Sequence, residues 1–197
     1  MQQFVEPHKG ETETFNKLSS GYDGLERYRV LYDLGKYVLN GVAGDILEIG
    51  VGESSYFLSR LGEQFKRRIF HCDISPSKIV NPMSVPGYLS DREDITYIEE
   101  RFPTPSNLKR VVCFAGASDV LFERVPITPL AMAFIDGDHL YEQTARDFWN
   151  TWKFLNEDGV IFLHDTYPPS EEWLDENHCG NVYILRQEFP TLWDKLE

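Results

Sequence analysis

The stretch DILEIGVG, residues 45–52, decides the fold of this chain, because a short apolar strand leads directly into a glycine turn. Ser54 or Ser55 can then cap a helix that extends to about Phe65. Glycines let the backbone come close to a ligand and adopt dihedral angles that other residues avoid. The segment therefore predicts a strand–turn–helix unit that either binds a nucleotide-like ligand or serves only as a tight turn.

Apolar runs with the length of strands recur along the chain and end in polar residues or glycine. They cover residues 69–73, 110–115, 130–136 and 159–164. Strands that alternate with helices pair in parallel through right-handed crossovers, and continuously apolar strands indicate that helices cover both faces of the sheet. We therefore expect a Rossmann-like, doubly wound α/β fold with a mostly parallel sheet. In such folds, ligands bind at the carboxyl ends of the strands.

Helical patterns fill the segments between these runs. Besides the helix after the glycine turn, they cover about 24–40, 119–123, 141–155 and 182–189. In the long helix over 141–155, the apolar side chains of Ala145, Phe148, Trp149 and Trp152 lie on or near one face.

The connection from Ile74 to Lys109 is the least regular part of the pattern, since it contains five prolines. One helix can fit within it, near Leu89–Arg101, and much of the remainder must be loop. Long loops in compact domains are usually functional or disordered. The segment therefore either faces the substrate or is a plain surface insertion.

The composition indicates a globular protein in which 42% of the residues are hydrophobic and 26% are charged. A length of 197 residues suits one domain over 1–197, with an N-terminal arm and helix over 1–40 and a cofactor-binding core over 42–190. The formal net charge of −13 disfavours nucleic acid and anionic lipid as partners, because both need clustered Lys and Arg.

Neither a membrane span nor a signal peptide is predicted, since no apolar run approaches about 20 residues and the N-terminus lacks a basic segment followed by an apolar one. The expected location is therefore cytoplasmic. Cys72, Cys113 and Cys179 form no C-x-x-C pair, which argues against a disulfide framework and against a structural zinc site. Cys72 and Cys113 lie in apolar runs and are predicted to be core residues.

Asp73 closes the second apolar run, 21 positions after Gly52. This spacing is close to the roughly 20 residues that separate the glycine turn from the ribose-binding acid in dinucleotide folds. A carboxylate at this position can accept both hydrogen bonds of a ribose diol, although an aspartate there can also cap a helix. The glycine turn and the spaced acid together predict a nucleotide or nucleoside site.

Two features distinguish between cofactors at this site. Dinucleotide folds favour a third glycine where this chain has Ser55, and Glu53 places a negative charge where a pyrophosphate would bind. A turn flanked by Glu48 and Glu53 instead suits a cofactor that carries a sulfonium and an ammonium group. These residues therefore favour S-adenosylmethionine over NAD or FAD.

Polar residues also follow the later strands. Ser118 and Asp119, after the strand at 110–115, form a small turn that can meet the edge of an adenine, and Ser118 can equally cap the next helix. The last two predicted strands end near a cluster of acids and imidazoles: Asp136, Asp138, His139, His164 and Asp165.

This cluster has three interpretations. It can bind a hard divalent ion that polarises a substrate hydroxyl. Alternatively, Asp138, His139 or His164 can act as a general base without a metal. In the third interpretation, Asp136 contacts the cofactor while His164 and Asp165 hold the loop in place.

The chain resembles the class I S-adenosylmethionine-dependent methyltransferases in four motifs, taken in order over about 42–190. These are EIGVG at 48–52, Asp73, FIDGDHLYE at 134–142 and DGVIFLHDT at 158–166. The branch that it is most similar to is type 24, which includes macrocin O-methyltransferase-like enzymes. The glycine turn is generic, whereas the combination of the last two motifs is more specific.

The resemblance implies roles for particular residues. It places cofactor contacts at Glu48, Gly50, Gly52, Asp73, Ser118 and Asp119. Relatives that bind magnesium ligate it at the positions of Asp136, His164 and Asp165, and their general base lies near Asp138. The histidine at one of the three ligand positions departs from the family pattern and places magnesium in question.

Two further departures concern the glycine turn and the end of the chain. Ser54 replaces the usual third glycine of the family motif. Class I methyltransferases normally finish with an antiparallel strand pair, and the sequence stops at Glu197 before such a pair is recognisable. The expectation is either a minimal variant or a truncated chain, and a missing edge would favour a homo-oligomer.

The leading hypothesis is therefore methyl transfer from S-adenosylmethionine to a hydroxyl of a small-molecule acceptor by in-line displacement. The acceptor class rests on the resemblance alone. The alternatives are a nicotinamide-dependent oxidoreductase and a non-catalytic module that binds the cofactor without turnover.

Overall fold

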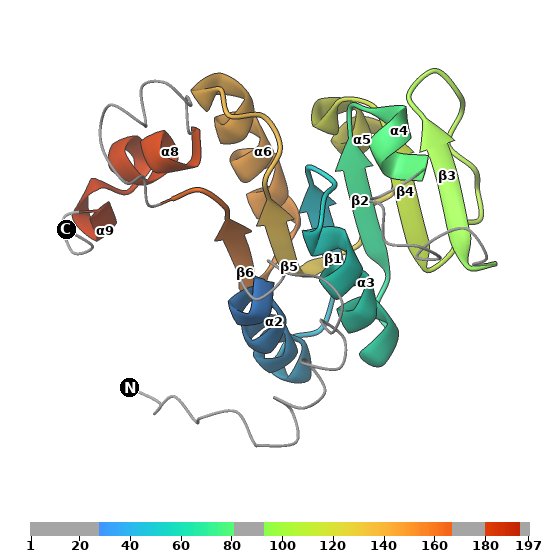
Figure 1. Ribbon diagram of the computed structural model, residues 1–197, viewed down its shortest axis with the longest axis horizontal. Coiled ribbons are helices and arrows are strands. Elements are labelled where there is room, and N and C mark those ends of the chain that lie inside the picture. Colours follow the sequence, from blue (N-terminus) through green and yellow to red (C-terminus); the bar gives the residue numbers. More distant parts are fainter. Residues whose placement is uncertain (1–27, 81–92, 167–179, 194–197) are drawn as a thin grey trace.

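The computed structural model describes residues 28–80, 93–166 and 180–193. Within this part of the chain, six strands form one sheet in the order β3-β4-β2-β1-β5-β6, and every pairing is parallel (Figure 1). The strands are β1 (Asp45–Ile49), β2 (Ile69–Asp73), β3 (Ile95–Glu99), β4 (Val111–Ala115), β5 (Leu130–Ile135) and β6 (Leu155–Leu163). The predicted doubly wound, parallel sheet is therefore confirmed.

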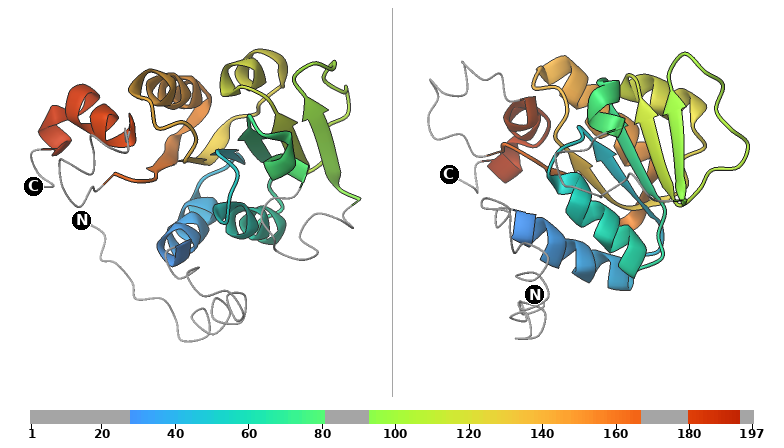
Figure 2. Two further views of the ribbon diagram at one scale, coloured as in Figure 1. Left: turned by 45° about the horizontal axis from the view of Figure 1, so that its top comes forward. Right: turned by 45° about the vertical axis from the view of Figure 1, so that its right-hand side comes forward.

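Helices cover both faces of this sheet. They are α2 (Arg29–Gly41), α3 (Ser54–Gln64), α4 (Pro76–Val80), α5 (Ser118–Arg124), α6 (Tyr141–Phe154), α8 (Gly180–Glu188) and α9 (Pro190–Trp193). Figure 2 shows α2 and α3 on one face and α5 and α6 on the other, with α8 beside α6. No helix among the described residues is long and apolar enough to cross a membrane.

The core forms because successive side chains of a strand point to opposite faces. In β1, Ile46 packs with Phe57 and Leu61 of α3, whereas Leu47 packs with Leu121 of α5 on the other face. Burying both faces requires apolar residues at nearly every position, which is why these strands read as continuous apolar runs. Cys72 and Cys113 are buried, as predicted for core residues, and Cys179 lies outside the described residues.

The prediction of a helix near Leu89–Arg101 is wrong for the part of that segment that the structure describes, from Glu93 onward. Residues 95–99 (ITYIE) instead form β3, which pairs in parallel with β4 at the edge of the sheet. Ile95 and Ile98 are buried, and Tyr97 between them is exposed. A segment rich in β-branched and aromatic residues fits a strand surface better than a helix.

The buried face of α6 is not the face on which its apolar side chains gather. The helix buries Thr144, Asp147, Phe148 and Thr151, whereas Trp149 and Trp152 are 39% and 53% exposed. The buried set is the apolar set Ala145, Phe148, Trp149 and Trp152 displaced by one residue, which is a rotation of about 100° around the helix axis. The inward face of α6 therefore carries polar side chains toward the carboxyl end of the sheet.

The order of the strands places a topological switch point at β1. Its neighbours are β2 on one side and β5 on the other, so the crossover helices leave in opposite directions. In open α/β sheets, ligands bind outside the carboxyl ends of the strands at such a point.

Candidate functional site

A cavity of about 270 Å³ lies at the carboxyl ends of β4, β2, β1 and β5. This volume is near the lower end of the range for small-molecule pockets, about 300 Å³. Five residues singled out in the sequence line it: Gly50, Asp73, Ser118, Asp136 and Asp138. Residues that sequence reasoning missed also line it, namely Lys78, Gln143 and Asp147. The pocket therefore occupies the place that the strand order predicts.

Gly50 joins the ends of three strands. Its N–H donates to the carbonyl of Cys72 at 2.9 Å, and the N–H of Asp136 donates to the carbonyl of Ile49 at 2.8 Å. The φ angle of Gly50 is +88°, and a Cβ there would collide with the carbonyl group of Asp136 and lie 2.7 Å from the nitrogen of Gly137. Glycine is therefore required at this position on both steric and conformational grounds.

Asp73 lies at the end of β2 and is only 8% exposed. Its Oδ2 accepts a hydrogen bond from the N–H of Val51 at 3.0 Å, and its Oδ1 accepts one from the N–H of Ser75 at 2.7 Å. Lys78 Nζ lies 3.5 Å from Oδ2. The carboxylate thus fastens the glycine turn to the start of α4, while its place in the pocket lining leaves it available to a ligand.

Glu48 lies outside the pocket, because its position in β1 directs it toward α3 rather than toward α5 and α6. The carboxylate is fully buried and accepts hydrogen bonds from Ser54 Oγ at 2.5 Å and Ser55 Oγ at 2.6 Å. His71 Nδ1 lies 2.5 Å from Oε2, and Ser59 Oγ lies 2.9 Å from Nε2 of the same ring. In this arrangement, Glu48 holds α3 against the sheet, and its side chain does not line the pocket.

Two other residues that were expected to contact the cofactor are also absent from the pocket lining. Gly52 donates its N–H to Ser55 Oγ at 3.2 Å. Asp119 accepts a hydrogen bond from Asn150 Nδ2 at 3.1 Å and lies 3.3 Å from Arg146 Nε, so it joins α5 to α6.

Asp147 is a buried acid in the pocket wall that sequence reasoning missed. Its side chain extends from α6, and the residue is 1% exposed. Its Oδ1 accepts hydrogen bonds from Ser118 Oγ at 2.5 Å and from Gln143 Nε2 at 3.0 Å. Burial raises the pKa of Asp147 to about 6, although both hydrogen bonds act in the opposite direction.

The substitution Asp147→Asn is expected to stabilise the folded protein near pH 8 by about 1–3 kcal/mol, because it removes a buried charge and keeps an oxygen for Ser118 and Gln143. The pKa of the folded carboxyl lies above its ordinary value of 3.8. The wild type should therefore gain stability as the pH falls from about 6 to about 4, and the difference from the variant should shrink over the same window.

Thermal unfolding of both proteins between about pH 4 and pH 8 measures this difference. Glu142→Gln changes an exposed acid on the same helix and should alter stability by less than about 0.5 kcal/mol. A lower melting temperature for Asp147→Asn than for the wild type at pH 8 would contradict the prediction.

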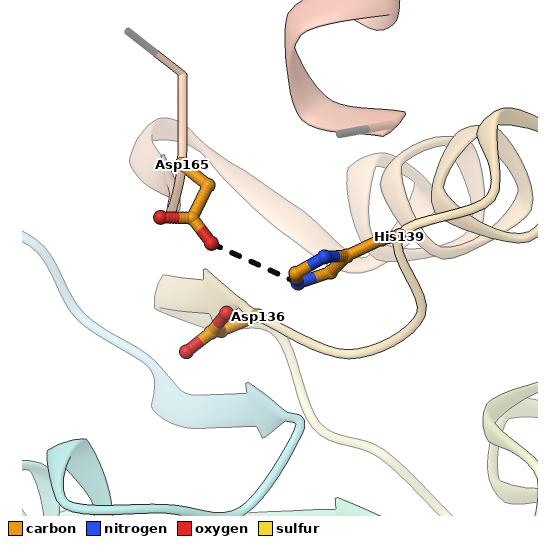
Figure 3. Close-up of side chains that lie close together, drawn as sticks. All are labelled: Asp136, His139 and Asp165. Atoms are coloured by element: carbon orange, nitrogen blue, oxygen red, sulfur yellow. Dashed lines mark ion pairs between the residues drawn. The ribbon is translucent and has the colours of Figure 1, made fainter. Parts of the chain in front are cut away.

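At the edge of the pocket, Asp136, His139 and Asp165 form a compact group at the ends of β5 and β6 (Figure 3). Each residue offers one ligand atom, and these atoms lie within 4.8 Å of one another. His139 Nε2 is 3.7 Å from Asp165 Oδ2. Asp165 has a φ angle of +51°, in the left-handed region that non-glycine residues rarely adopt and that occurs often at functional sites.

His164 lies on the other side of the same two acids. Its Nδ1 is 3.0 Å from Asp165 Oδ1 and 3.3 Å from Asp136 Oδ1. Hydrogen bonding to Asp136 raises the pKa of His164 to about 9, against the effect of burial, and the charges of Asp136 and Asp165 add to the rise. The group whose ligand atoms lie within 4.8 Å of one another contains His139, whereas the sequence prediction named His164 beside the same two acids.

Asn181 on α8 holds the end of β6 in place and was not indicated by any sequence motif. Its Nδ2 donates to the carbonyl of His164 at 2.6 Å and lies 3.4 Å from the carbonyl of Ile135. The N–H of Gly180 donates to the carbonyl of His139 at 2.7 Å. The start of α8 therefore fixes the two loops that carry the acid–imidazole group.

Comparison with known proteins places this geometry in a family. The family model Methyltransf_24, described as "Methyltransferase domain", matches residues 47–166, more than half of the chain. One similar solved structure is the apo form of a TDP-rhamnose 3'-O-methyltransferase, an enzyme in calicheamicin biosynthesis. Its TM-score is 0.50, with 17% identity over 93% of this chain and 87% of that chain, a likeness that shows the fold. No curated protein gives a significant match. The chain therefore belongs to the type 24 family of S-adenosylmethionine-dependent methyltransferases.

Proposed function

We propose that this enzyme methylates a hydroxyl oxygen of a small-molecule acceptor at the junction of β5 and β6. One observation carries the proposal: Asp136 both lines the pocket and belongs to the acid–imidazole group with His139 and Asp165. A methyl group presented from the pocket would therefore lie next to side chains that can bind and deprotonate a hydroxyl.

The pocket suggests how S-adenosylmethionine would lie. The ribose would bind at Asp73 and the sulfur-bearing tail near Gly50 and Asp136, with the adenine toward Ser118. Four aspartates and one lysine line the cavity: Asp73, Asp136, Asp138, Asp147 and Lys78. Such an acidic lining favours a cofactor with sulfonium and ammonium groups over a pyrophosphate, which would be repelled. Together with the family match, this disfavours the nicotinamide-dependent alternative.

The acid–imidazole group has the composition of a divalent cation site. Two carboxylates and one imidazole are ligands that manganese and other transition ions accept, whereas magnesium prefers oxygen alone. We assign Asp136, His139 and Asp165 as the residues that would hold the ion. A bound divalent ion would polarise the acceptor hydroxyl and so ease its ionisation.

The same residues can also serve an acid–base mechanism. His139 Nε2 lies near Asp165 Oδ2, so a proton taken up by the imidazole would face a carboxylate that stabilises it. Asp138 is held by its own turn, since its Oδ1 accepts a hydrogen bond from the N–H of Leu140 at 2.9 Å. We therefore favour His139 over Asp138 as the general base.

The acceptor class is inferred from chemistry and from one relative. The similar solved structure is, by its description, a methyltransferase of a TDP-linked sugar. A base and a candidate cation site beside the methyl donor suit a hydroxyl, which must lose its proton as the oxygen attacks. In-line displacement then requires the acceptor oxygen, the methyl carbon and the sulfur to be aligned.

The proposed function is tested by incubating the protein with S-adenosylmethionine and a panel of hydroxylated small molecules that includes nucleotide-linked sugars. The expected result is an acceptor that gains one methyl group by mass spectrometry while S-adenosylhomocysteine accumulates in equal amount. Binding of S-adenosylhomocysteine without turnover of any acceptor would instead support the non-catalytic alternative.

Removing one proposed ligand should abolish any response to metal. Asp165→Ala is expected to lower activity by about 100-fold or more and to eliminate the stimulation that Mg²⁺, Mn²⁺ or Ca²⁺ produces in the wild type. Calorimetric titration with Mn²⁺ alone measures the loss of the site independently of turnover.

The matched control for this experiment is Asp158→Ala, which removes an exposed acid from β6. It should respond to metal as the wild type does. A wild-type enzyme whose activity ignores both a chelator and added metal would refute the cation site and leave the metal-free base as the mechanism.

A further inference from the structure

Asp147 presents one carboxylate oxygen to the pocket. Its Oδ1 already accepts two hydrogen bonds, from Ser118 Oγ and Gln143 Nε2. Its Oδ2 has no hydrogen-bond donor among the described residues, lies 3.7 Å from the position of a Cβ on Gly137, and belongs to a side chain of the pocket lining. An acceptor without a donor, on a side chain that lines the pocket, can accept a hydrogen bond from a ligand.

The donors around Asp147 are locked by their own hydrogen bonds. Gln143 Nε2 donates to both Ser118 Oγ and Asp147 Oδ1, and Gln143 Oε1 accepts from Arg146. Ser118 Oγ receives the hydrogen bond of Gln143 and passes its own to Asp147. These hydrogen bonds hold the carboxylate in one orientation. Oδ2 is then the oxygen that can accept a hydrogen bond from a bound ligand.

Apolar and small residues of the same pocket suit a flat ring. Ile74 lines the same pocket and is 79% exposed, and the small residues Ala117 and Gly137 line it as well. Ile74 directly follows Asp73, so a ribose at Asp73 would bring its base between these walls. The exposed isoleucine offers an apolar surface to the face of the ring, and Asp147 offers an acceptor to its edge.

We propose that Asp147 recognises the adenine of the cofactor, with Oδ2 accepting a hydrogen bond from the exocyclic amino group. Asp147 is then a specificity-determining residue, which Ser118 and Gln143 hold in position. This inference rests on the proposed placement of S-adenosylmethionine in this pocket. The raised pKa of Asp147 agrees with it, because the two existing hydrogen bonds do not offset the burial of the charge and a donor from the ligand would lower the pKa further.

A pair of ligands tests the inference on the wild-type protein. S-inosylhomocysteine differs from S-adenosylhomocysteine in that a carbonyl oxygen replaces the amino group of the base. Because this oxygen would face a carboxylate, we expect calorimetry to give an affinity about 10- to 100-fold lower for the inosyl compound. Equal affinities would overturn the inference and leave the proposed function standing, whereas binding of neither ligand would overturn both.

The variant Asp147→Asn tests the residue itself. Its amide keeps an oxygen for Ser118 and Gln143 and turns an NH₂ group toward the ligand, which suits the inosyl carbonyl and opposes the adenine amine. The preference for the adenosyl compound should therefore fall at least tenfold or reverse. Glu142→Gln on the exposed face of α6 should keep the wild-type ratio. An unchanged ratio in Asp147→Asn would overturn the inference, and if that variant does not fold, the wild-type comparison decides.

Discussion

Gly50→Ala is expected to lower the free energy of unfolding by about 2–5 kcal/mol and to abolish cofactor binding. The positive φ angle alone costs an alanine about 1–2 kcal/mol, and overpacking of a tight site adds about 1–3 kcal/mol. The added methyl group would collide with the carbonyl group of Asp136, which belongs to backbone and cannot rotate away. Relief therefore requires the ends of β1 and β5 to separate, which displaces the proposed cofactor and acid–imidazole sites together.

Thermal or denaturant unfolding and calorimetry with S-adenosylhomocysteine measure the two effects of Gly50→Ala. The second glycine of the turn provides a matched control for stability, since a Cβ on Gly52 would meet nothing within 4 Å. Gly52→Ala should change the free energy of unfolding by no more than about 0.5 kcal/mol. If Gly50→Ala kept the wild-type stability, the close packing of β1 against β5 would be refuted.

The parts of the fold that the sequence predicted share one physical basis. Buried parallel strands need uninterrupted apolar runs, and each run that follows a crossover helix ends where the sheet meets the pocket. β1, β2, β4 and β5 were predicted within about one residue for this reason. β6 begins at Leu155 rather than near Gly159, because residues 156–158 (NED) are polar and interrupt the apolar run.

Side-chain direction explains much of what the sequence could not predict. Glu48 was expected to flank the cofactor because it precedes the glycine turn, but alternation along β1 places it beneath α3. Asp147 had no distinguishing signal, because the tryptophans of α6 indicated a buried face one residue away from the real one. The strongest apolar periodicity in α6 instead marks a surface where Trp149 stacks on Phe189 of the C-terminal segment.

The proximity of His139 to Asp136 and Asp165 could also be identified only from the structure. Sequence reasoning placed five candidates at adjacent strand ends, which is correct, but it could not rank two histidines at the same edge. In the structure, Asp165 lies between the two rings, 3.7 Å from His139 Nε2 and 3.0 Å from His164 Nδ1, and the His164 ring also contacts the rings of Tyr28 and Phe134. The two motifs therefore contribute one histidine that belongs to the three-residue group and one that pairs with both of its acids.

Asp73→Ala is expected to weaken the binding of S-adenosylhomocysteine by about 1–3 kcal/mol and also to destabilise the protein. The affinity falls because the ribose hydroxyls lose a charged acceptor. The stability falls because the N–H groups of Val51 and Ser75 lose the acceptors that they have in the wild type, at about 1–3 kcal/mol for each donor that stays buried without a partner. Both effects arise from one carboxylate, since the group that would bind the ribose also fastens the glycine turn.

Asp73→Asn and Asp33→Ala separate these two effects of the Asp73 carboxylate. The asparagine keeps one oxygen for a backbone N–H, so it should recover part of the lost stability, but it offers the ribose diol one acceptor fewer and should remain weak in calorimetry. Asp33 on α2 also forms ion pairs, with Arg29 and Lys36, yet it is partly exposed and does not line the pocket. Its replacement should cost less than about 1 kcal/mol and leave the affinity unchanged. Asp73→Ala removes both oxygens that would accept the hydrogen bonds of the ribose. An affinity equal to that of the wild type would therefore show that the ribose binds elsewhere.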